Sequence, residues 1–135
     1  MKKSQVSIEY LIIVGFVTFI LLSILAIAFL YSGTIKDQIK VTQLTNFANK
    51  ITSSAEAVFY SGKPSKTTIT VYLPEGVLSA SIVENSLLFS IQTSSGVNIV
   101  SFSSNVPISG TLSSTSGVKK IEITAQDDKV LINPV

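Results

Sequence analysis

The chain has 135 residues, enough for one modest domain and too few for two. It contains no cysteine, which excludes a disulfide framework and thiolate metal sites. Its net charge of +2 comes from ten lysines and eight acidic residues. The chain therefore lacks the excess of basic residues on one face that binding to nucleic acid requires.

The first element in chain order is an uncharged run from Leu11 to Leu30, which we call the apolar segment. A helix crosses a hydrocarbon core of about 30 Å with roughly 20 residues, and this run supplies that length. The apolar part of a secretory signal peptide is shorter, at about 7–15 residues. The sequence therefore predicts a membrane-spanning or permanently buried helix, with Tyr10 and Tyr31 suited to the two membrane interfaces.

Helical periodicity continues beyond the apolar segment, but there it becomes amphipathic. Apolar residues recur near the period of 3.6 that places them on one helix face; they are Ile35, Ile39, Leu44, Phe47, Ile51, Ala55 and Val58. Ser32-Gly33-Thr34 is a point at which the helix could kink. The glycine and proline in "SGKP" (61–64) should end the helix near Tyr60. We therefore predict one long helix over 5–60, with a membrane or filament-core part (5–31) and an amphipathic part (32–60).

After Pro64 the pattern changes to short alternating runs rich in β-branched residues, which is typical of strands. The predicted strands are 67–73, 78–83, 86–91, 97–102, 118–125 and 129–132, with a further edge strand around 108–112. Turns are expected at 84–85, 94–96 and 126–128. These runs predict a β-rich head domain over 65–135. The expected fold class is α+β, with the long N-terminal helix packed against a small antiparallel β-sheet.

The sequence contains few of the residue combinations that catalysis requires. No histidine is present to activate one of the many serines, although a Ser–Lys pair remains open. Asp127 and Asp128 fall in a predicted turn, where acids are common for local hydrogen bonding, and this favours a structural role over a metal site. No glycine-rich phosphate loop is present. We therefore expect no enzymatic activity, no cofactor and no metal.

Residues 1–31 allow three interpretations. They could be a cleaved signal peptide with "AIA" (26–28) as its small-residue cleavage site, or a signal-anchor whose Lys2 and Lys3 stay in the cytoplasm. Neither interpretation uses Glu9, which is costly where it is buried in a membrane. The third interpretation is cleavage between Ser4 and Gln5. It removes the two lysines and gives Gln5 an α-ammonium group four residues before Glu9.

That cleavage would give Glu9 a partner. An ammonium and a carboxylate can neutralise each other within one helix or between neighbouring helices, and in apolar surroundings either charge alone is expensive. The pairing would also fix the axial register between subunits. In addition, a negative charge in the first helical turn is favourable with the helix dipole.

The residues around this bond resemble the class III signal peptide of archaeal type IV pilin-like proteins. That pattern is Q-x-S-x-E-x-x-x-L; Gln5, Ser7 and Glu9 match it, and its final leucine falls on Ile13. The basic Lys2 and Lys3 just upstream belong to the same pattern. The resemblance implies that residues 1–4 are a leader, removed between Ser4 and Gln5 by a prepilin-type peptidase. It also implies that Gln5, Ser7 and Glu9 form the recognition motif, and that Gln5 and Glu9 act in assembly.

The resemblance further implies a structural subunit that waits in membrane lipid before it joins an extracellular surface filament. Its partners would be further copies of itself, other pilins, an assembly ATPase and a membrane platform protein. Archaellins, which share this architecture, usually have a glycine-rich start after the cleavage site; its absence here favours an adhesion pilin. The chain contains no N-x-Ser/Thr sequon, so N-glycosylation is not expected. The remaining alternative is a single-pass membrane protein with an extracytoplasmic β domain that does not polymerise.

Overall fold

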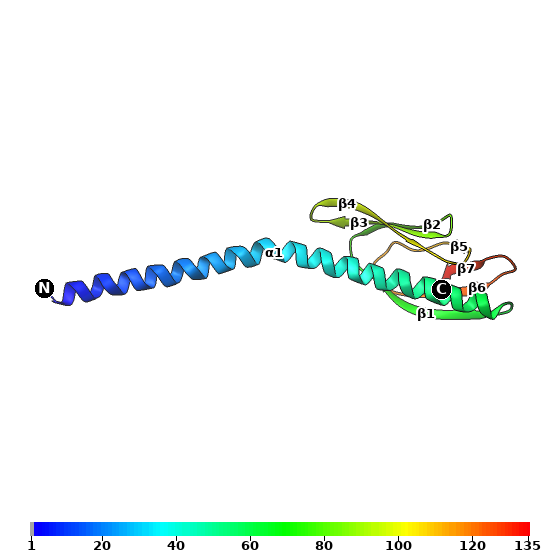
Figure 1. The fold of residues 1–135 in the computed structure, drawn as a ribbon, viewed down its shortest axis with the longest axis horizontal. Helices are drawn as coiled ribbons and strands as arrows, with labels where there is room; N and C mark the ends of the chain where they lie inside the picture. Colours follow the sequence, from blue (N-terminus) through cyan, green and yellow to red (C-terminus); the bar gives the residue numbers. More distant parts are fainter. Residues whose placement is uncertain (1) are drawn as a thin grey trace. The chain divides into compact units, whose positions relative to one another are not determined.

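The computed structural model describes the backbone of residues 2–135 and the side chains from Ser7 onward. Helix α1 (Lys2–Ser61) comes first and is followed by the strands (Figure 1). These are β1 (Lys66–Leu73), β2 (Val77–Val83), β3 (Ser86–Thr93), β4 (Gly96–Ser103), β5 (Ile108–Gly110), β6 (Gly117–Ala125) and β7 (Val130–Pro134). The predicted α+β class, with a long N-terminal helix packed against small, mainly antiparallel β structure, is confirmed.

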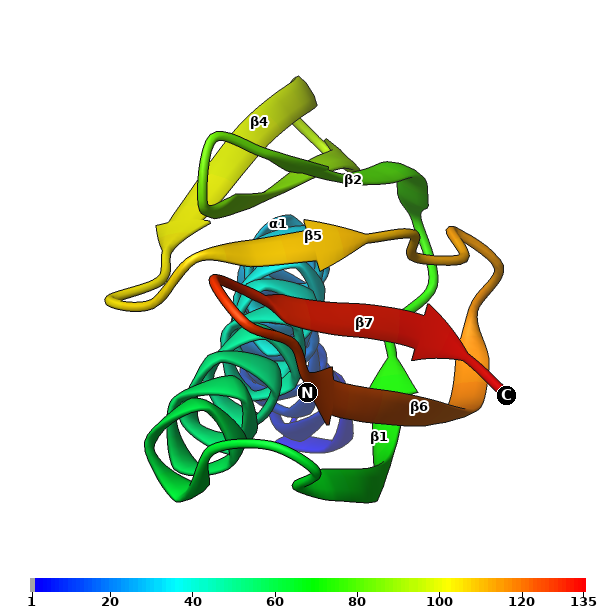
Figure 2. The ribbon, with the colours of Figure 1, turned by 90° about the vertical axis from the view of Figure 1, so that its right-hand side faces the viewer.

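The chain divides into two compact units, Met1–Lys36 and Asp37–Val135, and we call the second the head unit. Within the head unit the strands form two sheets rather than one. The larger sheet has the order β1-β6-β7-β5, and the smaller one is the meander β2-β3-β4. All strand pairs are antiparallel except β5 with β7, which run parallel. Figure 2 shows β5 beside β2, with β1 and β4 at the two opposite ends of the strand array.

The core of the head unit lies between these sheets and one face of α1. The helix contributes its buried residues at intervals of three and four, which places them on one stripe; they are Leu44, Phe47, Ala48, Ile51, Ala55 and Val58. Each long inner strand buries alternate residues against this stripe, for example Leu87, Phe89 and Ile91 of β3. The period of 3.6 on the helix and the period of 2 on the strands thus meet in one apolar layer.

The buried stripe is shorter than the sequence predicts. Ile39 belongs to the predicted stripe, yet its side chain is about half exposed, as is that of Ile35. Burial begins at Leu44, where β1 and β3 supply apolar partners such as Val71 and Phe89. Periodicity identified the correct face of the helix but could not show where the strands that cover it begin.

Polar contacts fix α1 to the strands at several points along the head unit. The Lys50 ammonium donates to the Thr70 carbonyl on β1 at 3.1 Å. The Asn105 amide, between β4 and β5, donates to the Glu56 carboxylate at 2.8 Å. These contacts flank the apolar stripe and position the helix along the sheets.

Two of the predicted turns, at 84–85 and 94–96, connect the strands of the smaller sheet. Glu84 and Asn85 both have positive φ, at 47° and 64°, as a two-residue type I′ hairpin between β2 and β3 requires. Two residues, Ser94 and Ser95, join β3 to β4. Gly62, with φ at 72°, ends α1 one residue beyond the predicted boundary.

Candidate functional site

The N-terminal part of α1 presents a predominantly apolar surface. Between Tyr10 and Tyr31 every large apolar side chain is exposed, with Phe29 and Leu30 at 79%. This surface points in all directions around the helix, so no single neighbour in the same chain could cover it. The structure thus contains a helix long and apolar enough to cross a membrane. An exposed apolar surface of this extent is typical of a contact with a membrane or with other protein chains.

Two polar residues interrupt the apolar segment, and both bond to the helix backbone. The Thr18 hydroxyl donates to the Val14 carbonyl at 2.7 Å, and the Ser23 hydroxyl donates to the Phe19 carbonyl at 2.8 Å. Each side chain bonds to the residue four positions earlier, as hydroxyls in helices commonly do. Both hydroxyls of the apolar segment are therefore satisfied, and apolar surroundings would not penalise them.

One side of the apolar segment has a hollow of about 180 Å³. Four residues surround it at the spacing i, i+3, i+4, i+7, namely Leu25, Ala28, Phe29 and Ser32. Four residues at this spacing form the hole into which a side chain of a facing helix inserts in knobs-into-holes packing. The small side chains of Ala28 and Ser32 make the hollow, so this face could accept a knob from another helix.

The residues of the predicted recognition motif do not lie on one helix face. Successive residues in a helix are about 100° apart, so Gln5 and Glu9 lie nearly above each other, while Ser7 lies on the opposite side. The side chains of Ser7 and Glu9 are exposed. The Cα–Cβ bonds of a helix tilt toward its N-terminus, which directs Glu9 toward the Gln5 backbone. The helix therefore brings Gln5 and Glu9 together and leaves Ser7 apart.

The predicted leader falls only partly within the described structure. The backbone of Lys2, Lys3, Ser4 and Gln5 belongs to α1, so the Ser4–Gln5 bond lies near the start of the helix. The side chains of these four residues lie outside the described part. The helix thus includes most of the predicted leader, whereas the sequence placed the helix start at Gln5.

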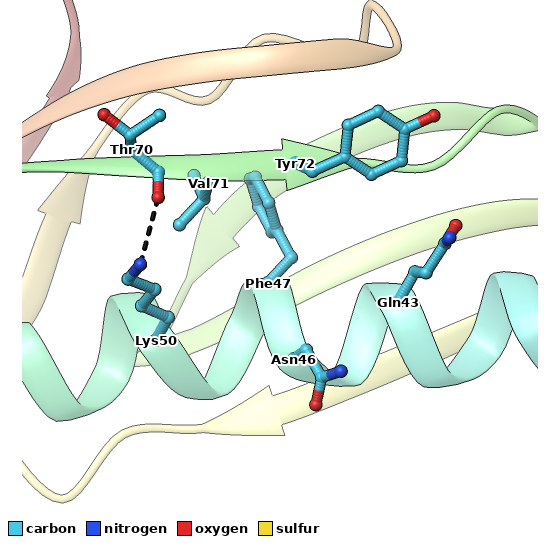
Figure 3. A pocket seen from close by; sticks show the side chains of 7 residues that line it. All are labelled: Gln43, Asn46, Phe47, Lys50, Thr70, Val71 and Tyr72. Carbon is cyan, nitrogen blue, oxygen red and sulfur yellow. Dashed lines mark hydrogen bonds between the residues drawn. The ribbon is translucent and has the colours of Figure 1, made fainter.

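A hollow of about 240 Å³ lies in the head unit between α1 and β1 (Figure 3). Its lining includes Phe47, Lys50 and Tyr72, and Figure 3 shows the Lys50 ammonium bonded to the Thr70 carbonyl at one end. Pockets that bind small molecules usually measure about 300–1,000 Å³. This smaller hollow, whose one ammonium group is already bonded, has the properties of a packing gap at the sheet edge.

The acidic turn between β6 and β7 has a structural partner. Lys63, just after α1, forms an ion pair with Asp127 at 2.5 Å, and both side chains are well exposed. Among the residues whose side chains are described, no cluster of three or more acidic residues could hold a metal ion. The ion pair joins the end of the helix to the hairpin, which agrees with the structural role expected for Asp127.

Sequence reasoning missed one charged site, at Asp37. Its carboxylate accepts hydrogen bonds from the hydroxyl and from the backbone N–H of Ser94, the latter at 2.9 Å. These two bonds, helped by nearby Lys40, lower the pKa of Asp37 below its usual value of 3.8. Asp37 lies on the polar side of the predicted amphipathic helix, and nothing in the pattern indicated its partner in a distant turn.

No protein-family model, curated protein or solved structure matches this chain. The fold by itself is compatible with a filament subunit and with a single-pass membrane protein. Assignment of a function therefore depends on the chemistry of the N-terminal residues and on the surfaces of the two units.

Proposed function

We propose that this chain is the precursor of a structural subunit of an archaeal type IV pilus-like surface filament that serves in adhesion. A prepilin-type peptidase removes residues 1–4, and the helices that remain pack together in the filament core. The observation that carries this proposal is the position of Glu9, two residues before an apolar segment that is exposed on every side. Where neighbouring apolar helices bury it, a carboxylate in that position is costly unless a positive group meets it.

Cleavage before Gln5 supplies that positive group. The new α-ammonium lies one helical turn from Glu9, and residues four apart on a helix are neighbours. The backbone around a peptide bond near a helix end unfolds more readily than the backbone in the middle, because helix ends fray, and a peptidase can then reach that bond. Removal of Lys2 and Lys3 also takes two positive charges from the helix start, where the helix dipole disfavours them.

The surface of the apolar segment supports its transfer from lipid to a bundle of helices. Association of helices in membranes depends on close packing, which small residues at the contact allow. The hollow around Ala28 and Ser32 provides such a contact. The membrane platform and the assembly ATPase would supply the work of extraction, and the head units would remain on the outside of the filament.

The alternative is a single-pass membrane protein whose head unit acts alone outside the cytoplasm. It accounts for the apolar segment equally well, because lipid covers that surface as completely as neighbouring helices do. It gives no role to Glu9, and it predicts a chain that keeps Lys2 and Lys3.

The test is the N-terminus of the protein taken from the surface of its native cell, determined by intact-mass and N-terminal peptide mass spectrometry. A chain that starts at Gln5, found in filaments by electron microscopy, supports the proposal. A chain that keeps residues 1–4 and remains in the membrane fraction supports the single-pass alternative. A start just after Ala28 would indicate a secreted β domain and would contradict both.

A further inference from the structure

The two outermost strands of the head unit differ in how their free edges are protected. β1 and β4 are the outermost strands, and each pairs with one neighbour within the described structure, β6 and β3 respectively (Figure 2). An outermost strand carries a row of unpaired backbone groups that can pair with another chain. Proteins usually protect such edges with charged residues, proline or a bulge.

The β1 edge is protected by lysine. The bond from Ala125 N–H to the Ser65 carbonyl shows that the odd-numbered residues of β1 bond to β6. The even-numbered Thr70 therefore directs its own N–H and carbonyl outward. The Lys50 ammonium occupies that outward carbonyl. Lys66, at the start of the same strand, forms an ion pair with Glu122 of β6 at 2.8 Å and so adds no free charge to this edge. A strand that approached this edge would have to displace a bonded ammonium group.

The β4 edge has no such protection. The bond from Ser104 N–H to the Asn85 carbonyl shows that the even-numbered residues of β4 bond to β3. The odd-numbered residues Val97, Ile99, Ser101 and Ser103 therefore direct their N–H and carbonyl groups outward. No charged residue and no proline occurs in β4, and Glu84 is the single charged residue between positions 77 and 118. Ile99, in the middle of this edge, is 75% exposed.

We propose that the β4 edge is a self-association site, at which the β4 strands of two copies of this chain pair antiparallel. The strand fits itself well. A twofold axis at Val100 places Ile99 opposite Ser101 of the second copy, and Val97 opposite its Ser103. In this register every outward N–H and carbonyl of the four odd-numbered residues finds a partner. Because β4 carries no charge, the pairing places no like charges together, and a second copy needs no compensating group.

The symmetry of this contact determines what it joins. A twofold contact uses the same surface on both partners and closes after two copies. Subunits within one helical filament are related by a screw rotation, so the contact joins heads of separate filaments. One isolated pair of strands is only marginally stable in water. Many such pairs, formed at once along two neighbouring filaments, bind the filaments strongly. The bundling of filaments rests on the proposed function, but the pairing of two heads does not.

The test uses the full chain in its native cell, with a single introduced thiol, because the natural sequence has no cysteine. In Ile99→Cys the thiols of two paired strands are diagonal neighbours, about 7–8 Å apart, within reach of a short bismaleimide. The matched control is Val118→Cys, an exposed apolar position outside β4, on the strand β6 that pairs there with β1; its side chain is 69% exposed. We expect a cross-linked dimer for the first variant and none for the second.

A second variant separates pairing from chance collision. Val97→Pro in the Ile99→Cys background removes an outward N–H without loss of a bond to β3, which an edge strand tolerates. It should abolish the dimer while a monofunctional maleimide still labels the thiol. A dimer that survives Val97→Pro, or that is equally abundant in Val118→Cys, would overturn the inference. So would the absence of a dimer in labelled Ile99→Cys.

Electron micrographs of the same cells distinguish this inference from the proposed function. Wild-type filaments should lie in side-by-side bundles, Ile99→Lys filaments should separate, and Val118→Lys filaments should remain bundled. If the filaments are single and Ile99→Cys gives no cross-linked dimer, the proposed function stands and the pairing of β4 strands is overturned. A cross-linked dimer of that variant in cells without filaments would retain the pairing, and would overturn both the proposed function and the bundling.

Discussion

Asp37 on α1 accepts both hydrogen bonds that Ser94 can donate, from its backbone N–H and from its hydroxyl, although 57 positions separate them in the sequence. Ser94 lies in the turn between β3 and β4, so this contact fixes the end of that hairpin to the helix. The same turn leads into the exposed β4 edge. The position of that edge therefore depends in part on one carboxylate.

This contact predicts a dependence on pH. Since folding lowers the pKa of Asp37 below 3.8, its contribution to stability is complete above that value and is lost as the pH falls through the lowered pKa. The amide chemical shift of Ser94, followed by NMR of the full chain in detergent micelles, should titrate below 3.8. Asp37→Asn should remove this titration, whereas Asp128→Asn should leave it unchanged. A Ser94 amide that titrates normally in Asp37→Asn would contradict the assignment.

Gly110 is predicted to be intolerant of any side chain. Its φ is +132°, and a Cβ at this position would overlap the backbone oxygen of Ile132 on β7, the strand that pairs with β5. Gly110→Ala should therefore lower the free energy of unfolding by about 3 kcal/mol, from strain and displacement of backbone. Gly96→Ala is the control, because Gly96 also has positive φ but has open space around it, and it should cost about 1 kcal/mol. Urea unfolding followed by tyrosine fluorescence would compare them; equal losses would contradict the clash.

The aromatic contacts of Phe89 predict a large effect of its truncation. This fully buried ring meets Phe47 of α1 and Phe102 of β4, with centroid distances of 5.8 and 6.0 Å. Phe89→Ala should lower the free energy of unfolding by about 3–5 kcal/mol, through lost burial and the cavity left behind. Phe89→Leu keeps most of the volume and should cost under half of that. If Phe89→Ala left the urea midpoint of the head unit unchanged, the ring could not be central to this core.

Glu9 provides the prediction that is specific to assembly. Glu9→Ala should permit cleavage before Gln5 but impair polymerisation, because the α-ammonium then has no partner in the apolar bundle. Filament yield by electron microscopy and the N-terminus by mass spectrometry separate the two effects. Glu84→Gln, a charge removal in the exposed turn between β2 and β3, should leave both unchanged. Normal filaments from Glu9→Ala would contradict the pairing of this carboxylate.

Most of the helix and the strands could be predicted from the sequence because their periods are strong. The stripe from Leu44 to Val58 and the alternation in β3 each identify a buried face. The charge pattern also separated the apolar segment from the amphipathic part of α1. These features depend on neighbours within a few residues, which sequence patterns record well.

Other features depend on pairing between distant segments, and local patterns do not record it. The parallel pairing of β5 with β7 depends on a long connection through β6. The bond between Asp37 and Ser94 and the protection of β1 by Lys50 likewise join residues far apart in the sequence. The exposed β4 edge could be recognised only once the strand order was known, although the absence of charge between 85 and 118 was visible beforehand.

The inward-bonded hydroxyls of Thr18 and Ser23 have a consequence for how neighbouring helices become aligned. A hydroxyl that donates its proton to its own backbone has no donor left for a neighbouring helix and can only accept a hydrogen bond from it. Apolar helices have no donors to offer either, so in the proposed filament steric fit would be the main barrier to sliding or rotation of one helix against another between Tyr10 and Tyr31. Precise alignment would then depend on the two ends of the chain, on the charge of Glu9 and on contacts between head units.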